Sequence, residues 1–455
     1  MTDSTNTGRG TTTRRSVLGR TAAGVGVFGG VMAGPADART DVSRANGTPD
    51  LVVPVISDTH VERASEGGKN QRELREALSQ LNDAAPRSDV IVVLGDFTDN
   101  GYTEEYDRFD EAFRTFEEAQ QDATSLFAIG NHEYFGPATD EAQQRFLDRT
   151  GMPSIYYHEV VNEYHFIVLG TEDDRASGTF SAEQIEWLDD QLALAEADTP
   201  DRPIFVFHHQ PLQDTVYGDE WGIEKNGDEL YDTLREYPQV ISFSGHTHYP
   251  MDDPRIVHQR DFTAVGTGTI ETMWVPSGRK QGEVPPDADV LNQGLVVEVR
   301  GADVVIRRRD FHADSWTDDP LGIDPFGEFT YTDDRDRTPP EFPDDACLSI
   351  ASRSPTELEI EIPQATDDRL THDYRVRATD RITGVIVREF LAFSEFYRDP
   401  VPDPLSLTVD ELTPGTPYEI EVWAIDSFDN ESERALRTEG RTSPRVRTLS
   451  ESDES

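Results

Sequence analysis

The stretch DVIVVLGDFTDN, residues 89–100, joins a run of apolar residues to a polar cluster. Residues 90–94 are all Val, Ile or Leu, the composition of a strand that is buried on both faces. The run ends abruptly, and Asp96, Asp99 and Asn100 follow within six positions. Carboxylates beside a buried strand are costly unless they have a partner such as a metal ion. Other segments of the chain indicate what that partner is.

Four other apolar runs end in the same kind of polar cluster. They are LVVPVISDTH, SLFAIGNHE, PIFVFHHQP and VISFSGHTH, which end on Asp58 and His60, Asn131 and His132, His208 and His209, and His246 and His248. Open α/β sheets place their binding sites beyond the carboxyl ends of the strands. The donors are Asp, His and Asn without thiolates, a mixture that suits Mn, Fe or Zn. The pattern therefore predicts a divalent-metal site built from five strand ends.

Helical patterns separate these strands. Residues 70–81 place their leucines on one helical face, and residues 181–192 begin with a capping box formed by Ser181 and Gln184. A third stripe consists of Phe109, Phe113 and Phe116. These stripes are typical of core packing, and strands alternating with helices predict an α/β fold.

The second half of the chain changes character. Residues 294–311 read as a hairpin, 313–339 are rich in Pro and Asp and are expected to be loop, and 340–446 alternate apolar and polar residues without helical patterns, which predicts a separate all-β module. The expected order is a signal peptide over 1–38, a linker over 39–49, an α/β domain over 50–312, a linker over 313–339, the β module over 340–446 and a disordered tail over 447–455.

The N-terminal 38 residues resemble a twin-arginine export signal. They contain the pair Arg14-Arg15, a Gly/Ala/Val-rich apolar run over 21–32 and a small-residue cleavage sequence over 36–38. No other segment has the length and apolar character of a membrane span. The resemblance implies export in folded form and an extracellular or cell-surface location.

Charge and cysteine content narrow the function further. The 455 residues include 89 Asp+Glu against 41 Lys+Arg, a formal net charge of −48, spread along the whole chain. Such a surface repels nucleic acid and anionic membranes. Because the charge is not collected in one tail, a halophilic protein is favoured over a binding site for a cationic partner. Cys347 is the single cysteine, so no disulfide forms within the chain, and we expect it to be buried as a small apolar residue.

Taken together, the five strand ends resemble the calcineurin-like metallophosphoesterase family. That family's motifs D-x-H, G-D-x-x-D, G-N-H-[ED], H before Pro, and G-H-x-H read here as Asp58–His60, Gly95–Asp99, Gly130–Glu133, His209–Pro211 and Gly245–His248. Their order is complete, and the likeness spans residues 50–312. The resemblance implies a four-layer α/β/β/α sandwich that carries two divalent metal ions, Mn, Fe or Zn.

Roles carry over from the family to matching positions. The resemblance assigns one metal to Asp58, His60 and His248, the other to Asn131, His209 and His246, and a bridging position to Asp96. The family usually reads H-x-P, which selects His209, while the strand end also permits His208. His132 resembles the acid that protonates the leaving oxygen, and Asp99 resembles its orienting partner. Asp99 has a second interpretation as a loop-capping residue.

The same resemblance implies the reaction and narrows the substrate. A hydroxide bridging the two metals would attack phosphorus in line. Family members that act as serine/threonine protein phosphatases have an arginine where this chain has Asn100, so a small-molecule phosphoester, and a phosphodiester over a monoester, is favoured. Loops over 61–70, 134–140, 213–228 and 249–285 are candidates for specificity. They carry Trp221, Lys225, Trp274, Arg279 and Lys280. These loops either bind an anionic substrate or are ordinary exposed loops.

Residues 412–432 resemble the last strands of a fibronectin type III module, an immunoglobulin-like sandwich, with Tyr418 and Trp423 as expected core aromatics. Such a module is either an accessory domain that contacts cell wall or glycan, or a spacer. A different class of function is an inactive cell-surface binding protein that uses both domains as a scaffold. The complete set of metal-ligand candidates argues against that alternative.

Overall fold

The computed structural model describes residues 47–63, 67–173 and 175–445. The expected signal peptide over 1–38 and tail over 447–455 lie outside these ranges, as does most of the 39–49 linker. Within the described part of the chain, none of the helices is both long and apolar enough to cross a membrane.

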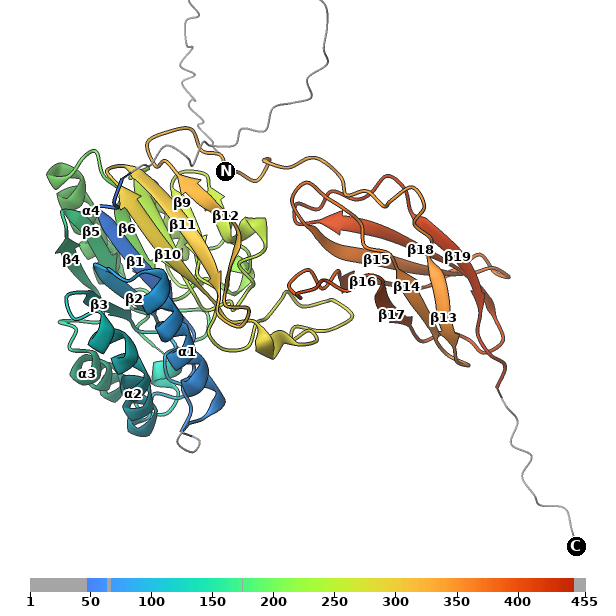
Figure 1. Ribbon diagram of the computed structural model, residues 1–455, viewed down its shortest axis with the longest axis horizontal. Helices are drawn as coiled ribbons and strands as arrows, with labels where there is room; N and C mark the ends of the chain where they lie inside the picture. Colours follow the sequence, from blue (N-terminus) through green and yellow to red (C-terminus); the bar gives the residue numbers. More distant parts are fainter. Residues whose placement is uncertain (1–46, 64–66, 174, 446–455) are drawn as a thin grey trace, which may run out of the picture. The chain divides into compact units, whose positions relative to one another are not determined.

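Two six-stranded sheets form the centre of the first domain (Figure 1). The first has the order β12-β11-β10-β1-β2-β3, with strands β1 (Leu51–Ile56), β2 (Val90–Leu94), β3 (Thr124–Ala128), β10 (Gln293–Arg300), β11 (Asp303–Asp310) and β12 (Ser315–Ile323). The second has the order β4-β5-β6-β7-β9-β8, with strands β4 (Tyr157–Val161), β5 (Tyr164–Val168), β6 (Ile204–His208), β7 (Val240–Ser244), β8 (Val257–Gln259) and β9 (Thr263–Gly266). In both sheets the strands that precede the polar clusters pair in parallel.

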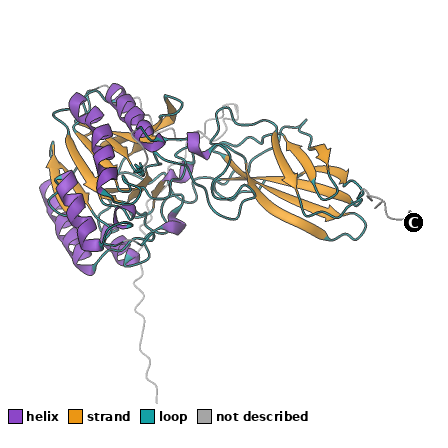
Figure 2. Cartoon of the chain, turned by 90° about the horizontal axis from the view of Figure 1, so that it is seen from below, coloured by secondary structure: helices purple, strands orange, loops and turns teal. Residues whose placement is uncertain are grey.

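Helices cover the outer faces of the two sheets (Figure 2). The apolar residues of the strands alternate between a core that both sheets share and a core beneath the helices. The first sheet packs against α1 (Lys69–Ala84), α2 (Thr103–Ala119) and α3 (Thr139–Thr150), and the second against α4 (Ala182–Asp198) and α5 (Gly227–Leu234). Short 3₁₀ helices lie at η2 (His132–Tyr134), η3 (Asp219–Trp221), η4 (Pro254–Ile256) and η5 (Ala288–Val290). The predicted α/β/β/α sandwich is confirmed.

The predicted helices begin and pack as their patterns indicate. Ser181 caps α4, because its Oγ accepts the Gln184 N–H at 3.2 Å. The Gln184 side chain does not reach back to close the box; it is buried and bonds the main chain of Gly170 instead. The phenylalanine stripe of α2 is buried against the first sheet.

The loop predicted over 313–339 is wrong in its first part. Residues 315–323 form β12, which pairs with β11 at the edge of the first sheet. Its Pro320 falls where the pairing register shifts, between the partners of Ile306 and Arg308. An edge strand with a bulge tolerates proline because that position needs no ladder hydrogen bond. The Pro/Asp-rich composition concealed this strand.

The C-terminal module is an antiparallel β-sandwich. One sheet contains β13 (Ser349–Arg353), β14 (Leu358–Ile362) and β17 (Leu405–Val409), and the other has the order β16-β15-β18-β19, with β15 (Thr371–Asp380), β16 (Ile386–Phe393), β18 (Pro417–Asp426) and β19 (Leu436–Arg441). Both sheets contribute to one apolar core. The buried Tyr418 hydroxyl accepts the Thr413 N–H at 2.8 Å, a tyrosine corner typical of immunoglobulin-like sandwiches.

Two predictions for this module are wrong. Trp423 is not a core aromatic: it faces the side of β18 opposite Tyr418, half-buried, beneath the guanidinium groups of Arg375 and Arg377 at 4.2 and 4.9 Å. Alternation along a strand puts odd and even positions on opposite faces, so both aromatics could not share the core. Cys347 is exposed, because it lies in an irregular segment before β13.

Candidate metal centre and its cavity

The five polar clusters meet where β1, β2, β3, β6 and β7 end. Parallel strands deliver their carboxyl ends to one edge, and the two sheets bring these edges together. The backbone there is unusual, because five non-glycine residues have φ between 40° and 70°: Asp58, His60, Asp96, His246 and His248. Non-glycine residues adopt this left-handed region rarely, and its gathering at one place indicates a functional constraint. All five are predicted metal ligands.

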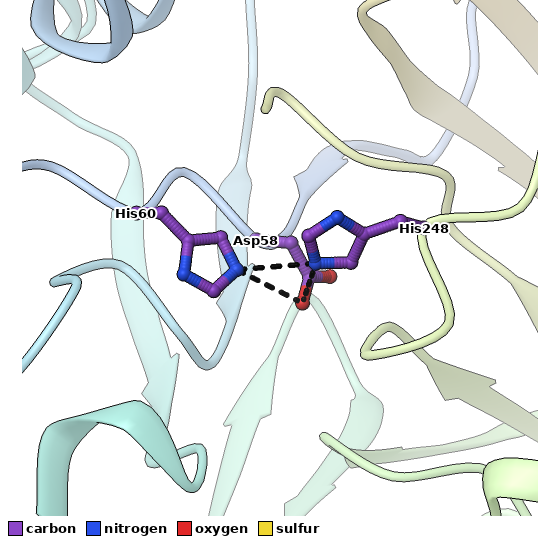
Figure 3. Close-up of side chains that lie close together, drawn as sticks. All are labelled: Asp58, His60 and His248. Carbon is purple, nitrogen blue, oxygen red and sulfur yellow. Dashed lines mark hydrogen bonds and ion pairs between the residues drawn. The ribbon is translucent and has the colours of Figure 1, made fainter. Parts of the chain in front are cut away.

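Asp58, His60 and His248 form one compact cluster (Figure 3). The two Nε2 atoms of His60 and His248 lie 3.1 Å apart, and they lie 3.9 and 3.3 Å from Asp58 Oδ1. The other ring nitrogen of His248 lies 2.8 Å from the Thr272 carbonyl oxygen, to which it can donate. That bond fixes the ring so that Nε2 faces the carboxylate, an arrangement typical of metal-binding histidines.

Asp96, His209 and His246 form a second cluster. Asn131 is buried and lines the same cavity as His246. His209 Nε2 lies 2.9 Å from Asp96 Oδ2, and its Nδ1 lies 2.6 Å from the Leu94 carbonyl oxygen, its hydrogen-bond acceptor. The Asn131 side-chain oxygen accepts a hydrogen bond from Gln210 Nε2 at 3.1 Å. Carboxylate, imidazole and amide oxygen together suit a borderline divalent cation.

The two clusters adjoin each other. His60 Nε2 of the first lies 4.0 Å from Asp96 Oδ2 of the second, and His209 Nε2 of the second lies 3.8 Å from Asp58 Oδ1 of the first. Asp96 is therefore within reach of donors from both groups. The two clusters hold six of the seven predicted ligands, and the seventh, Asn131, lines the same cavity as His60, His246 and His248.

His208 points elsewhere. Its Nδ1 lies 2.6 Å from the Gln210 carbonyl oxygen and its Nε2 lies 2.7 Å from Ser242 Oγ. Both nitrogens are thus engaged within the second sheet. Of the two histidines that sequence left open, only His209 aims a nitrogen at the cluster.

His132 lies at the rim of the clusters. Its Nε2 is 3.9 Å from Asp96 Oδ2, so it also comes within reach of His60 and Asp96 as a third donor group. Its Nδ1 lies 2.9 Å from the main-chain oxygen of Asp99, whereas the Asp99 carboxylate is 3.9 Å away. The contact between the predicted acid and its predicted orienting partner therefore runs through the main chain.

Glu133 has a role that sequence reasoning missed. Its side chain is fully buried and accepts the N–H groups of Asp96, Thr98 and Gly130 at 2.9 to 3.0 Å, together with the Thr98 hydroxyl. It thereby ties the loop after β2 to the loop after β3. Its place as the last residue of the G-N-H-[ED] motif was the signal available in the sequence.

The site fits metal ions by three independent observations. His209 Nε2 is buried and, among the described residues, has an ion-pair contact with Asp96 Oδ2 at 2.9 Å but no hydrogen-bond partner. A Cβ on Gly130 would lie 2.2 Å from Asp96 Oδ1, and one on Gly245 would lie 2.6 Å from Asp58 Oδ2, so both glycines keep space for a ligand side chain. The donors are those that divalent transition metals prefer.

Protonation in the cluster is consistent with this interpretation. Burial, followed by neighbouring imidazoles, lowers the pKa of His60 and of His246 to about 3, so both rings are neutral, as a metal ligand must be. Burial favours the protonated form of Asp58, but the imidazoles of His248 and His209 outweigh it and lower the pKa to about 2. Burial opposes charge on His209 too, yet Asp96 and Asp58 raise its pKa to about 10. A cation bound there would replace that proton.

A cavity of about 530 Å³ opens above the clusters. His60, Asn131, His132, His246 and His248 form part of its lining, and most of the remainder is aromatic or acidic. No Lys or Arg belongs to the lining among the described residues.

The basic residues of the predicted specificity loops do not supply this cavity with charge. Arg279 pairs with Asp373 at 2.9 Å, and Lys280 pairs with Asp410, both in the C-terminal module. Lys225 is exposed outside the lining. Trp221 and Trp274 do line it. The expectation that these loops offer cations to an anionic substrate is therefore wrong for the described residues, because carboxylates of the other module take up two of the three.

The fold and the site together define a class of protein. Residues 51–250 match the family model described as Calcineurin-like phosphoesterase, so the chain carries a calcineurin-like phosphoesterase domain and is a metal-dependent phosphoester hydrolase. Residues 255–321 match a domain of unknown function, DUF4073. In the structure this stretch is not separate: it supplies β8 to β11 and most of β12, which complete both sheets.

Curated relatives place the likeness among phosphodiesterases. The chain is 25% identical over 209 residues to the probable glycerophosphodiester phosphodiesterase GpdQ of Arcobacter nitrofigilis, covering 44% of this chain and 72% of that protein. It is 29% identical to a cAMP/cGMP dual specificity phosphodiesterase of Mycobacterium tuberculosis and 28% identical to a probable cyclic nucleotide phosphodiesterase of Rhodococcus erythropolis, again over 209 residues. These matches cover 44% and 43% of this chain, and 63% and 64% of those proteins.

A solved structure, purple acid phosphatase PPD1 from yellow lupin seeds, aligns with 60% of this chain and 53% of its own. Its TM-score is 0.45 and its sequence identity is 16%, a level that carries no argument about function.

Proposed function

We propose that this protein is an exported phosphodiesterase that works with two divalent metal ions. Asp58, His60 and His248 would hold one ion, Asn131, His209 and His246 the other, and Asp96 would bridge them. One observation carries this proposal. Two buried His/Asp clusters adjoin a cavity, and a histidine of each cluster lies within 4.0 Å of the Asp96 carboxylate.

The metal ions and the histidines of the site would have different roles in the reaction. Divalent cations bound here would supply the charge that activates water and neutralises phosphoryl oxygens. Nδ1 of His209 and Nδ1 of His248 each lie within hydrogen-bond distance of a main-chain carbonyl oxygen, and this contact keeps the Nε2 atoms directed toward the site. His132, tied through Nδ1 to the Asp99 carbonyl, turns Nε2 toward the clusters. When both nitrogens carry protons, Nε2 can donate one to the leaving oxygen.

The cavity favours a diester over a monoester. A phosphate monoester carries up to two negative charges near neutral pH, and phosphate-binding sites commonly meet them with Arg or Lys. The described lining offers no such residue. Asn100, where protein phosphatases of the family have arginine, bonds the Asp99 carboxylate instead. The names of the three relatives support the same choice.

A substrate panel tests this proposal. Purified protein is assayed with Mn or Zn against bis(p-nitrophenyl) phosphate and p-nitrophenyl phosphate, beside Asp96→Asn and Asn131→Ala. We expect faster turnover of the diester and loss of activity in both variants. Faster turnover of the monoester would contradict the diesterase assignment. Protein that binds metal but hydrolyses neither ester would favour the inactive binding scaffold.

Export, halophily and an accessory role for the sandwich stay predictions that rest on sequence. The Arg14-Arg15 pair supports twin-arginine export, and the charge of −48 supports a saline setting. The strand order of the sandwich supports a fibronectin type III-like module. Its role, either contact with cell wall or glycan or that of a spacer, rests on sequence alone. Loss of secretion on changing both arginines to lysine would support the export route, and unchanged secretion would argue against it.

A further inference from the structure

A pair of tryptophans forms one wall of the cavity. Trp221, from η3, and Trp274, from the loop after β9, meet edge to face with ring centroids 5.1 Å apart. Trp274 also lies 5.7 Å, centroid to centroid, from the ring of His248 in the first metal cluster. Both indoles are half-buried and belong to the cavity lining. The cavity therefore has an aromatic surface next to His248, a predicted metal ligand.

Five carboxylates line the same cavity as the two tryptophans. Glu62, Asp99, Glu220, Glu224 and Glu271 all belong to the lining. Glu220 is held in place, because its Oε1 accepts the Tyr249 hydroxyl at 2.9 Å. Acidic residues are common over the whole chain, so they alone would not indicate a ligand. Their combination with the tryptophan pair, and with a described lining that contains no Lys or Arg, is more specific.

We infer that the cavity recognises phosphodiesters in which one alcohol carries a positively charged ammonium group. This inference rests on the proposed phosphodiesterase function. The single negative charge of the diester would lie at the metal clusters, and the ammonium would lie against the indoles of Trp221 and Trp274, within the field of Glu220. Aromatic faces attract quaternary and primary ammonium groups, and nearby carboxylates strengthen the attraction.

Two synthetic esters that differ at one atom test the inference. They are choline p-nitrophenyl phosphate and its neutral isostere 3,3-dimethylbutyl p-nitrophenyl phosphate, in which carbon replaces nitrogen. In both, water adds to phosphorus while the bond from phosphorus to the nitrophenyl oxygen breaks, releasing nitrophenolate, and the protons of the water pass to the buffer. At fixed salt we expect kcat/KM to favour the choline ester at least tenfold, about 1.4 kcal/mol. A ratio near one would overturn the inference.

Variants locate the preference within the cavity. We expect the kcat/KM ratio to fall toward one in Glu220→Gln, which keeps the acceptor for Tyr249, and in Trp274→Leu or, should that variant misfold, Trp221→Leu. Trp423→Leu, in the C-terminal module, and Glu229→Gln, exposed on α5, are matched controls that should keep the wild-type ratio. An unchanged ratio in both cavity variants would refute the assignment of these residues.

A binding measurement separates this inference from the proposed function. If neither ester is hydrolysed, the phosphodiesterase proposal fails, but calorimetry still compares phosphocholine with 3,3-dimethylbutyl phosphate. Tighter binding of phosphocholine, lost in Trp274→Leu, would uphold the ammonium site without catalysis. Equal binding of the two would reject it.

Discussion

At the scale of single residues, the centre depends on donors that have no freedom to turn away. His209 and His248 are each fixed by a main-chain carbonyl, and Glu133 fixes the loops that carry Asp96 and Asn131. Outer contacts of this kind commonly contribute tenfold to 100-fold in metal affinity. Substitutions of the residues that hold the predicted ligands should therefore also change metal affinity.

The two adjacent histidines give the cleanest residue-level contrast. We expect His209→Ala to lower metal affinity by roughly 100-fold or more, because it removes a donor and leaves Asp96 without its partner. His208→Ala should keep the metal, because its ring bonds only Gln210 and Ser242. Metal titration followed by calorimetry measures both variants. Stronger metal loss in His208→Ala would reverse the assignment.

Glu133 should act through stability. In Glu133→Ala three buried main-chain N–H groups lose their acceptor, and each orphaned donor costs about 1–3 kcal/mol. We expect a large fall in the unfolding free energy of metal-free protein, measured in urea. Glu133→Gln retains one acceptor oxygen and should lose less. Equal stability of wild type and Glu133→Ala would show that the loops hold together without this carboxylate.

At the scale of elements, the ends of strands determine the site, and the sequence reveals most of it. Apolar runs identify β1, β2, β3, β6 and β7, and the residues after them are the donors that the structure gathers. The left-handed backbone at Asp58, Asp96 and His246 could not be foreseen, because it arises from tertiary convergence. Strand β12 was missed for a related reason: an edge position permits a composition that reads as loop.

Gly130, which follows the end of β3, packs closely against Asp96. We expect Gly130→Ala to displace the Asp96 carboxylate, since the new Cβ would lie 2.2 Å from its Oδ1, and to weaken metal binding about tenfold or more. Gly47→Ala is the control, because among the described residues no atom beyond its chain neighbours lies within 4 Å of the added Cβ. Metal titration compares the metal affinity of both variants with that of the wild type. Unchanged metal affinity in Gly130→Ala would show that the loop moves to accept the new methyl group.

At the scale of the whole molecule, the C-terminal module supports the cavity through the loop after β9. That loop carries Trp274, while its flanking Met273 and Val275 are fully buried in a cluster with Phe393 and Phe396 of the sandwich. Ion pairs from Arg279 and Lys280 fix the same loop to the module. The sequence patterns distinguish an α/β part from an all-β part, but they cannot pair residues so distant in the chain.

Removing this support should affect substrate binding. We expect Phe393→Ala to destabilise the cluster by about 3–5 kcal/mol, loosen the loop and raise KM for the diester more than it lowers kcat. Ile382→Ala, on a side chain that is 74% exposed in the same module, is the matched control. Steady-state kinetics with both variants measures the effect. Wild-type KM in folded Phe393→Ala would show that the loop holds its position without the module.

Two cations that share the Asp96 carboxylate would give a metal content of two ions per chain, which metal counting measures. Protein purified without chelator, dialysed with Mn or Zn and analysed by inductively coupled plasma mass spectrometry should hold two divalent ions per chain. Asp96→Asn should hold fewer than one, because it weakens both positions at once. A single ion in the wild type, or two ions retained in Asp96→Asn, would contradict the account.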